Sequence, residues 1–219
     1  MFLEVADLLK PDEVARLRSI AQTAPFVDGR VSNPHATMKK NLQLDMSNSA
    51  YQQSSELMQA ALTRNESVRN FAFPKMIAPP LLTRHEVGMT YGPHTDTPFM
   101  ALGQTALRSD LSCTIFLSSP DSFVGGELCI YLGTKPVMFK PSAGSAVLYP
   151  STTVHEVRPV TAGTRLVGIT FIESRIANAE HREILYELGE VDATEGLSMK
   201  PVNRIRLGWA IGSLHREWS

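Results

Sequence analysis

Apolar residues recur at helical spacing near both ends of the chain. The first stripe begins after Pro11, a residue that suits the first turn of a helix, and it stops before Pro25. A second helical pattern runs from about residue 49 to residue 64, a third follows Arg175, and the tail from 203 to 219 predicts a last, weaker helix. The stripes consist of Val14, Leu17, Ile20 and Ala21; of Leu57, Met58, Ala61 and Leu62; and of Ile184, Leu185 and Leu188.

The middle of the chain has a different pattern, with short apolar runs separated by glycine or proline. The runs are MIAPPLLTRHEV, LSCTIFLSS, GELCIYLG, KPVMFK, SAVLYP, VHEVRPV and RLVGITFIES. This spacing predicts an antiparallel sandwich or a small barrel. We therefore expect a mainly β protein with flanking helices, divided into an N-terminal helical region (1–75) packed on the core, a β core (76–175) and a C-terminal helical extension (176–219).

Composition and charge narrow the class of protein. The chain has 219 residues, 43% hydrophobic and 20% charged, with a net charge of −1, so nothing predicts nucleic acid or an anionic membrane as a partner. No apolar run approaches the roughly 18 residues of a membrane span, and the start MFLEVADLLKPDE lacks the features of a signal peptide. Cys113 and Cys129 lie in apolar runs. We interpret them as buried free thiols, which predicts a cytoplasmic protein.

The first candidate site residues lie in the segment YGPHTDTP, residues 91–98. His94 and Asp96 are two residues apart, so on an extended chain they point to the same side. His155 follows a Pro-Ser-Thr-Thr break further along. Two histidines and one carboxylate form the facial triad of non-haem Fe(II) oxygenases. The alternative is that these are ordinary turn residues, since His-x-Asp also occurs by chance.

Arg165 strengthens the metal hypothesis. We expect residues 162–164 to form a hairpin loop, which would pair Thr161 with Arg165, set His155 opposite Phe171 and place His155 and Arg165 on one face. The two residues would then be roughly 13–20 Å apart. A buried arginine needs an anion, and the distal carboxylate of 2-oxoglutarate would provide one. A salt bridge to an internal acid is the alternative, with Asp110 and Glu127 as the possible partners.

Several other residues are weaker candidates for the rim of the site. Lys39 and Lys40 could belong to a lid or be merely solvated, and Asn41 and Gln43 fit a substrate rim or one polar face of a strand equally well. The segment 97–110 should border the mouth. Arg108 belongs to that segment, and Arg84 could point to either side of its strand. Met89, Phe99 and Met100 fit the core or the substrate wall equally well, and Gly125 and Gly126 fit a turn.

The chain resembles the PKHD-type hydroxylases, Fe(II)/2-oxoglutarate dioxygenases related to prolyl 4-hydroxylases. The motifs that carry the resemblance are KKNLQLD, RHEVGMTYGPHTD, RSDLSCTIFLSSP, GGELCI, AGSAVLYPSTTVHEVRPVTAGTRLVGITFIES and the tail NRIRL…REWS. The resemblance implies a double-stranded β-helix (jelly roll), with His94, Asp96 and His155 as iron ligands and Arg165 as the 2-oxoglutarate anchor. It also places His85, in TRH, where the family has a tyrosine that contacts the cosubstrate.

The resemblance predicts an enzyme that hydroxylates a small molecule or a peptide. Its cofactors would be Fe(II), 2-oxoglutarate and O2, with ascorbate as a candidate reductant. Two alternatives stay open, a jelly-roll sensor that binds metal or ligand without turnover and a cupin-like metalloenzyme that does not use 2-oxoglutarate. The C-terminal helices are a candidate surface for a homo-oligomer. No residue distinguishes a prolyl peptide, an amino acid and a siderophore-like molecule as substrate.

Overall fold

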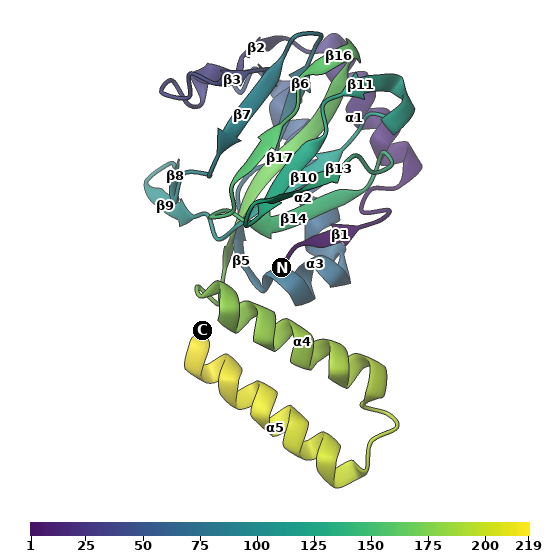
Figure 1. Cartoon of the computed structure of the whole chain (residues 1–219), viewed down its shortest axis with the longest axis vertical. Helices are drawn as coiled ribbons and strands as arrows, with labels where there is room; N and C mark the ends of the chain where they lie inside the picture. The colour runs from purple at the N-terminus through teal and green to yellow at the C-terminus, as the bar shows by residue number, and fades with distance from the viewer.

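The larger of two β-sheets forms the middle of the molecule. A computed structural model describes all 219 residues and has the predicted mainly β fold, a jelly roll with flanking helices (Figure 1). The larger sheet has eight antiparallel strands, seven of them in one path while β5 pairs with β17. In path order they are β1 (Leu3–Val5), β14 (Ala146–Pro150), β10 (Leu111–Phe116), β17 (Arg165–Ser174), β6 (Leu81–His85), β4 (Leu42–Leu44) and β2 (Phe26–Asp28), with β5 (Pro74–Ile77) beside them.

A smaller sheet of five strands faces the larger one, and two short ribbons complete the fold. The smaller sheet has the order β13 (Lys135–Phe139), β12 (Leu128–Leu132), β15 (His155–Val157), β7 (Thr90–His94) and β3 (Lys39–Lys40). The ribbons are β11 (Phe123–Gly125) with β16 (Val160–Gly163), and β8 (Phe99–Leu102) with β9 (Thr105–Arg108). The first 75 residues therefore contribute strands to both sheets as well as helices.

Side chains of the larger sheet alternate between two buried environments. On β10, Leu111, Cys113 and Ile115 join a cluster of 22 buried residues that includes residues of the helices. Phe116 belongs to a second cluster of seven buried residues, between the two sheets. Ser112, two positions before Thr114, has the same orientation as Phe116 and so faces the smaller sheet. Because both faces of β10 are covered, all six of its residues are buried.

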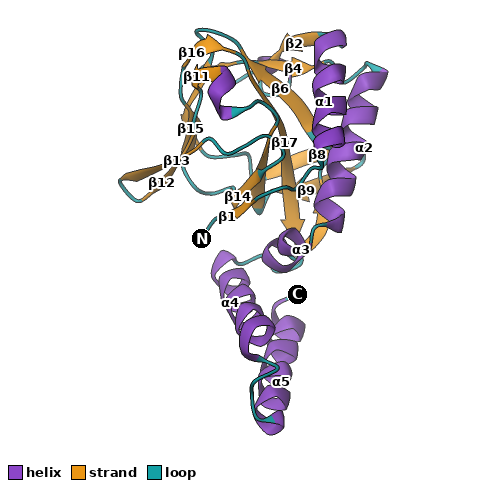
Figure 2. Cartoon of the chain, turned by 90° about the vertical axis from the view of Figure 1, so that its right-hand side faces the viewer, coloured by secondary structure: helices purple, strands orange, loops and turns teal.

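Five helices flank the sheets. Helices α1 (Pro11–Thr23) and α2 (Ser49–Arg64) lie side by side against the outer face of the larger sheet (Figure 2), and α3 (Glu66–Ala72) follows α2. The side chain of Asn48 caps α2 by accepting a hydrogen bond from the Ala50 amide. The predicted helices at 11–24 and 49–64 are confirmed, whereas α3 was not predicted. Two 3₁₀ turns cover Gly29–Val31 and Pro120–Ser122.

The predicted hairpin at residues 162–164 is wrong. β16 pairs with β11 and not with β17, so Thr161 does not pair with Arg165, and the residue opposite Phe171 is Ser112. Gly163 does have the expected positive φ, 72°, but for another reason. A Cβ there would lie 2.2 Å from the carbonyl oxygen of Ser122. The glycine is therefore required where the chain crosses from the β11–β16 ribbon to the larger sheet.

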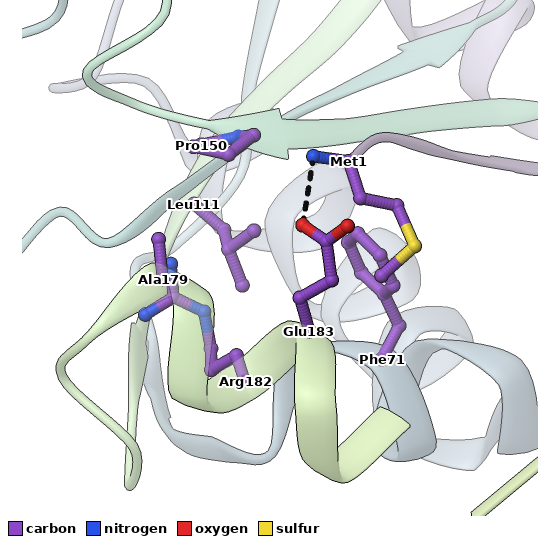
Figure 3. Close-up of a pocket in the computed structure, with 7 residues that line it drawn as sticks. All are labelled: Met1, Phe71, Leu111, Pro150, Ala179, Arg182 and Glu183. Carbon is purple, nitrogen blue, oxygen red and sulfur yellow. Dashed lines mark hydrogen bonds and ion pairs between the residues drawn. The ribbon is translucent and has the colours of Figure 1, made fainter. Parts of the chain in front are cut away.

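Helices α4 (Ala179–Glu195) and α5 (Pro201–Trp218) form a hairpin that extends below the sheets (Figure 1). The base of α4 joins the core at a cavity of about 30 Å³, where Glu183 binds the amino group of Met1 at 3.3 Å (Figure 3). The buried Arg182 donates to the carbonyls of Ile176 and Ala177. None of the helices has the combination of length and apolar character that a membrane-spanning segment requires.

Candidate metal centre

His94, Asp96 and His155 converge between the two sheets although they come from distant parts of the sequence. His94 ends β7 and His155 begins β15, and the two residues are direct partners in the antiparallel pairing of these strands. One potential ligand atom from each of the three side chains lies within 4.8 Å of the others. Nε2 of His94 is 3.9 Å from Asp96 Oδ1, and Nε2 of His155 is 3.5 Å from Asp96 Oδ2.

Hydrogen bonds orient the two imidazoles. Nδ1 of His94 lies 2.8 Å from the carbonyl oxygen of Gly92, and Nδ1 of His155 lies 3.0 Å from that of Thr153. A carbonyl can only accept, so Nδ1 carries a proton in both rings and Nε2 is the ring atom available to a metal. This is the arrangement in which a histidine binds a metal through Nε2.

A β-bulge shapes the strand that carries His94. The pairing of β15 with β7 shifts register between His155 and Val157, so that β7 has one extra residue there. As a result Tyr91 and His94, three residues apart, lie on the same side and their rings stack with centroids 3.6 Å apart. Tyr149 packs edge-on against His155 at 4.9 Å. Aromatic rings therefore hold both imidazoles in place.

Two serines that sequence reasoning missed support Asp96. The hydroxyl of Ser112 donates to Asp96 Oδ2 and also contacts the hydroxyl of Ser151 at 2.8 Å. The amide of Asp96 donates to the carbonyl of Ser151 at 3.1 Å. The only sequence signal for Ser112 is that a polar residue alternates with buried apolar residues in LSCTIF.

The three side chains fit a divalent iron ion. Burial lowers the pKa of His94, and the neighbouring His155 lowers it further, so this imidazole is neutral and able to bind a metal. The set of two nitrogen donors and one carboxylate contains no thiolate, since both cysteines are buried elsewhere. Such a set suits Fe(II) and leaves coordination positions open for other ligands.

Arg165 and His85 form a polar pair at one end of the interior. They are direct partners in the pairing of β17 with β6, and Arg165 Nη1 lies 3.5 Å from His85 Nδ1. Both residues are 2% exposed, and neither Arg165 Nε nor His85 Nε2 has a hydrogen-bond partner. Burial lowers the pKa of Arg165 to about 10. Burial, followed by the charge of Arg165, lowers the pKa of His85 well below its usual value.

The salt-bridge alternative for Arg165 is wrong. Asp110 pairs with Arg108, with Nε and Oδ1 2.8 Å apart. Glu127 makes no ion pair with Arg165 or with any other residue. Arg165 is therefore a buried cation without a carboxylate, next to a histidine that burial keeps neutral. Such a site has the charge and the free donors to bind an anion.

The other candidate residues differ in burial and position. Lys39, Asn41 and Gln43 are buried, whereas Lys40 is exposed. Gln43 alternates with the apolar Leu42 and Leu44 on β4, as one of the two interpretations predicted. Arg84 lies on the face of the larger sheet opposite to that of His85, where it stacks over Phe26 and pairs with Glu86. Phe99, on the ribbon β8–β9, is exposed.

Comparison with known proteins agrees with this geometry. A family model described as the 2OG-Fe(II) oxygenase superfamily matches residues 80–173. A PKHD-type hydroxylase of Sphingopyxis alaskensis is 46% identical over 98% of both chains, and one of Rippkaea orientalis is 40% identical over 87% of this chain and 86% of its own.

Solved structures share the fold at low sequence identity. A prolyl-4-hydroxylase of Pseudomonas putida superposes with a TM-score of 0.55 at 19% identity, covering 79% of this chain and 92% of its own. HygX of Streptomyces hygroscopicus, solved with nickel, 2-oxoglutarate and hygromycin B, superposes with a TM-score of 0.51 at 16% identity, covering 79% of this chain and 82% of its own. The matched segment 80–173 contains the three convergent side chains and the pair Arg165 and His85.

Proposed function

The chain belongs to the PKHD-type hydroxylases of the 2OG-Fe(II) oxygenase superfamily, and we propose that His94, Asp96 and His155 hold its iron while Arg165 and His85 hold its 2-oxoglutarate. The enzyme is an Fe(II)- and 2-oxoglutarate-dependent dioxygenase. The observation that carries the residue assignment is the convergence of three suitable donor groups in the same interior as an unpaired buried arginine.

Bound Fe(II) supplies the dioxygen chemistry, in which 2-oxoglutarate and O2 become succinate and carbon dioxide while a substrate C–H bond becomes an alcohol. The side chains hold and orient the reactants. Ser112 and Ser151 keep the Asp96 carboxylate directed at the two Nε2 atoms. The carbonyls of Gly92 and Thr153 accept hydrogen bonds from Nδ1 of His94 and His155, so that Nε2 is the atom of each ring that faces the metal position.

We assign Arg165 to the distal carboxylate of 2-oxoglutarate. A guanidinium matches a carboxylate with two parallel hydrogen bonds, and the desolvation of Arg165 is compensated once an anion arrives. His85, which lies beside it and has a free Nε2, would add a hydrogen bond or pack against the cosubstrate. This role would replace that of the family's tyrosine.

Titration of the Fe(II)-loaded protein with 2-oxoglutarate under argon, followed by a succinate assay in air, tests this assignment. Binding should need both the metal and Arg165, and succinate should form only when oxygen is admitted. Membership of a hydroxylase family disfavours the two alternatives, a sensor without turnover and a cupin-like enzyme.

The substrate is a small molecule or a peptide, the two classes present in the similar structures. One of these is a prolyl hydroxylase from Trichoplax adhaerens with a peptide fragment, and HygX contains hygromycin B. We propose that nucleic acid and membranes are not partners, in line with the net charge of −1. We also propose a cytoplasmic location, supported by two buried cysteines that form no disulfide.

The C-terminal hairpin supports a further proposal, that two copies of the chain associate through it. No residue of α5 is buried, and Ile205 and Trp209 are 71% and 73% exposed. With Val202 they form one apolar stripe, and Ile184 and Val191 form a second on α4. An apolar stripe that stays exposed in the monomer is a candidate surface for a packing partner.

The charges of the two helices favour a second copy as that partner. Only one ion pair joins the helices within the hairpin, Arg204 with Asp192. Two hairpins related by a twofold axis would form a four-helix bundle in which the acidic α4 of each copy faces the basic α5 of the other. The acidic residues of α4 without an ion pair in the chain are Glu180, Glu187, Glu190 and Glu195, and the basic ones of α5 are Arg206 and Arg216. On this basis we propose that residues 176–219 are an assembly element added to the core of 76–175, against which the helices of the first 75 residues pack.

A further inference from the structure

Lys39 is a buried lysine at the edge of the smaller sheet. It lies on β3, opposite Tyr91 on β7, and its residue is only 6% exposed. The ammonium nitrogen lies 5.8 Å from the centre of the Tyr91 ring, which stacks on His94. The ammonium is thus close to one of the proposed iron ligands, with one aromatic ring beside it.

This ammonium has no anionic partner. Its single hydrogen bond goes to a neutral group, the hydroxyl of Ser32 at 3.0 Å, and it takes part in no ion pair. Burial lowers the pKa of Lys39, and the charges of Asp96 and Asp28 oppose that effect. The other buried cations are Arg182, which donates to two carbonyls, and Arg165, the proposed carboxylate anchor.

The segment after Lys39 continues a polar lining. Lys39, Asn41 and Gln43 alternate along the chain, and all three are buried. Asn41 Oδ1 and both amide atoms of Gln43 lack hydrogen-bond partners. Gln43 is the register partner of Thr83, two residues before His85, so this lining reaches the Arg165–His85 pair. Buried polar atoms left without partners are expected where a polar ligand binds.

We propose that Lys39 binds a carboxylate of the substrate, so that the molecule hydroxylated is an organic acid. This inference rests on the proposed function, in which Arg165 meets one carboxylate of 2-oxoglutarate and the metal meets the other. The cosubstrate then leaves Lys39 free. The remaining reactant is the substrate, and an anionic group on it would give the buried ammonium a charged partner. Because Lys39 lies beside the strand of His94, that acid group sits near the C–H bond that is oxidised.

The test compares acids with their amides. N-acetyl amino acids, each as the free carboxylate and as the primary amide, are titrated calorimetrically under argon into protein loaded with Fe(II) and 2-oxoglutarate. Wild type should bind the acids at least about 10-fold more tightly than the amides, as expected of a charge-assisted hydrogen bond. Lys39→Met should abolish that preference. Lys40→Met, which changes the exposed neighbour, should keep it, and Lys39→Arg should keep part of it.

Each outcome decides the matter. The proposal is overturned if the wild-type protein binds no acid more tightly than its amide. It is also overturned if Lys39→Met still binds the acids more tightly than the amides. A 10-fold loss of 2-oxoglutarate affinity in Lys39→Met also overturns it, because the carboxylate would then belong to the cosubstrate. The proposed function fails separately, if Arg165→Met binds 2-oxoglutarate as wild type does. Replacing a buried ammonium by an apolar side chain of similar length should preserve the fold, which thermal unfolding of each variant verifies.

Discussion

The hydroxyl of Ser112, on the larger sheet, donates a hydrogen bond to the carboxylate of Asp96, which follows a strand of the smaller sheet. This contact links the two sheets at the metal centre. Ser112 also contacts Ser151, so its hydroxyl is held between two partners. Ser112 thereby orients a proposed ligand without itself contacting the metal.

Ser112→Ala should weaken iron binding. Removal of a group that orients a metal ligand typically costs about 10- to 100-fold in metal affinity or activity. Competition with a chromophoric chelator measures the Fe(II) affinity of each variant. Ser145→Ala, at a buried serine elsewhere in the fold, is the control and should bind iron normally. Equal affinities in the two variants would show that Ser112 does not position Asp96.

His85→Ala should weaken 2-oxoglutarate binding about 10- to 100-fold and leave iron binding intact, because His85 lies beside Arg165 and is not among the three convergent side chains. Anaerobic titration gives the cosubstrate affinity, and elemental analysis gives the iron content. Loss of stoichiometric iron from this variant would make His85 a ligand and contradict the assignment of the three others.

The buried His85 also predicts a pH dependence of stability in the iron-free protein. Its folded-state pKa lies well below the unfolded value of 6.5, so below that pH the unfolded chain takes up a proton that the folded protein excludes. The free energy of unfolding should therefore fall as pH falls from about 6.5, by up to about 1.4 kcal/mol per pH unit for one proton. The loss should stop once the folded-state pKa is passed.

Urea unfolding between pH 7.5 and 5 measures this slope. His85→Gln should make it shallower, because the substituted side chain does not titrate. His94, whose pKa burial also lowers, should account for part of the remaining slope. His35→Gln, at an exposed position, is the control and should leave the slope unchanged. An identical slope in His85→Gln and wild type would contradict the neutral, buried state of His85.

The C-terminal hairpin predicts a dimer that a single charge disrupts. Trp209→Asp should shift the molar mass from twice that of the 24.1 kDa chain to that of the monomer, since it places a carboxylate in the proposed apolar seam. Light scattering after size-exclusion chromatography measures the mass. Val124→Asp, at a position 58% exposed on β11, is the matched control. Wild type that is monomeric at micromolar concentration would refute the association.

Much of the fold could be predicted because its elements are long or strongly patterned. The run RLVGITFIES coincides with β17, and the apolar stripe of 49–64 coincides with α2. The short strands β1, β2 and β3 were missed because two or three residues carry no periodicity. The hairpin at 162–164 was predicted wrongly because a glycine with positive φ marks a sharp change of direction but does not identify the strand that follows it.

The candidate site was predictable where chemistry alone identifies a residue. His94, Asp96, His155 and Arg165 have residue types and spacings that point to metal and anion binding. Ser112 could not be found, because its role depends on the pairing of β10 with its neighbours. The burial of Lys39 could not be predicted either, because two adjacent lysines are equivalent in sequence. Only the pairing of β3 with β7 turns one of them inward.

The cosubstrate affinity of Arg165→Met tests the central claim most directly. The bond between the guanidinium and a carboxylate contributes about 1.5–3 kcal/mol, so the 2-oxoglutarate dissociation constant of the Fe(II)-loaded variant should rise roughly 10- to 150-fold under argon. Arg165→Lys should recover only part of the affinity, because a point charge cannot form the two parallel hydrogen bonds. Iron binding should be unchanged in both variants. If Arg165→Met binds 2-oxoglutarate as tightly as wild type, Arg165 does not anchor the cosubstrate and the proposed site is wrong.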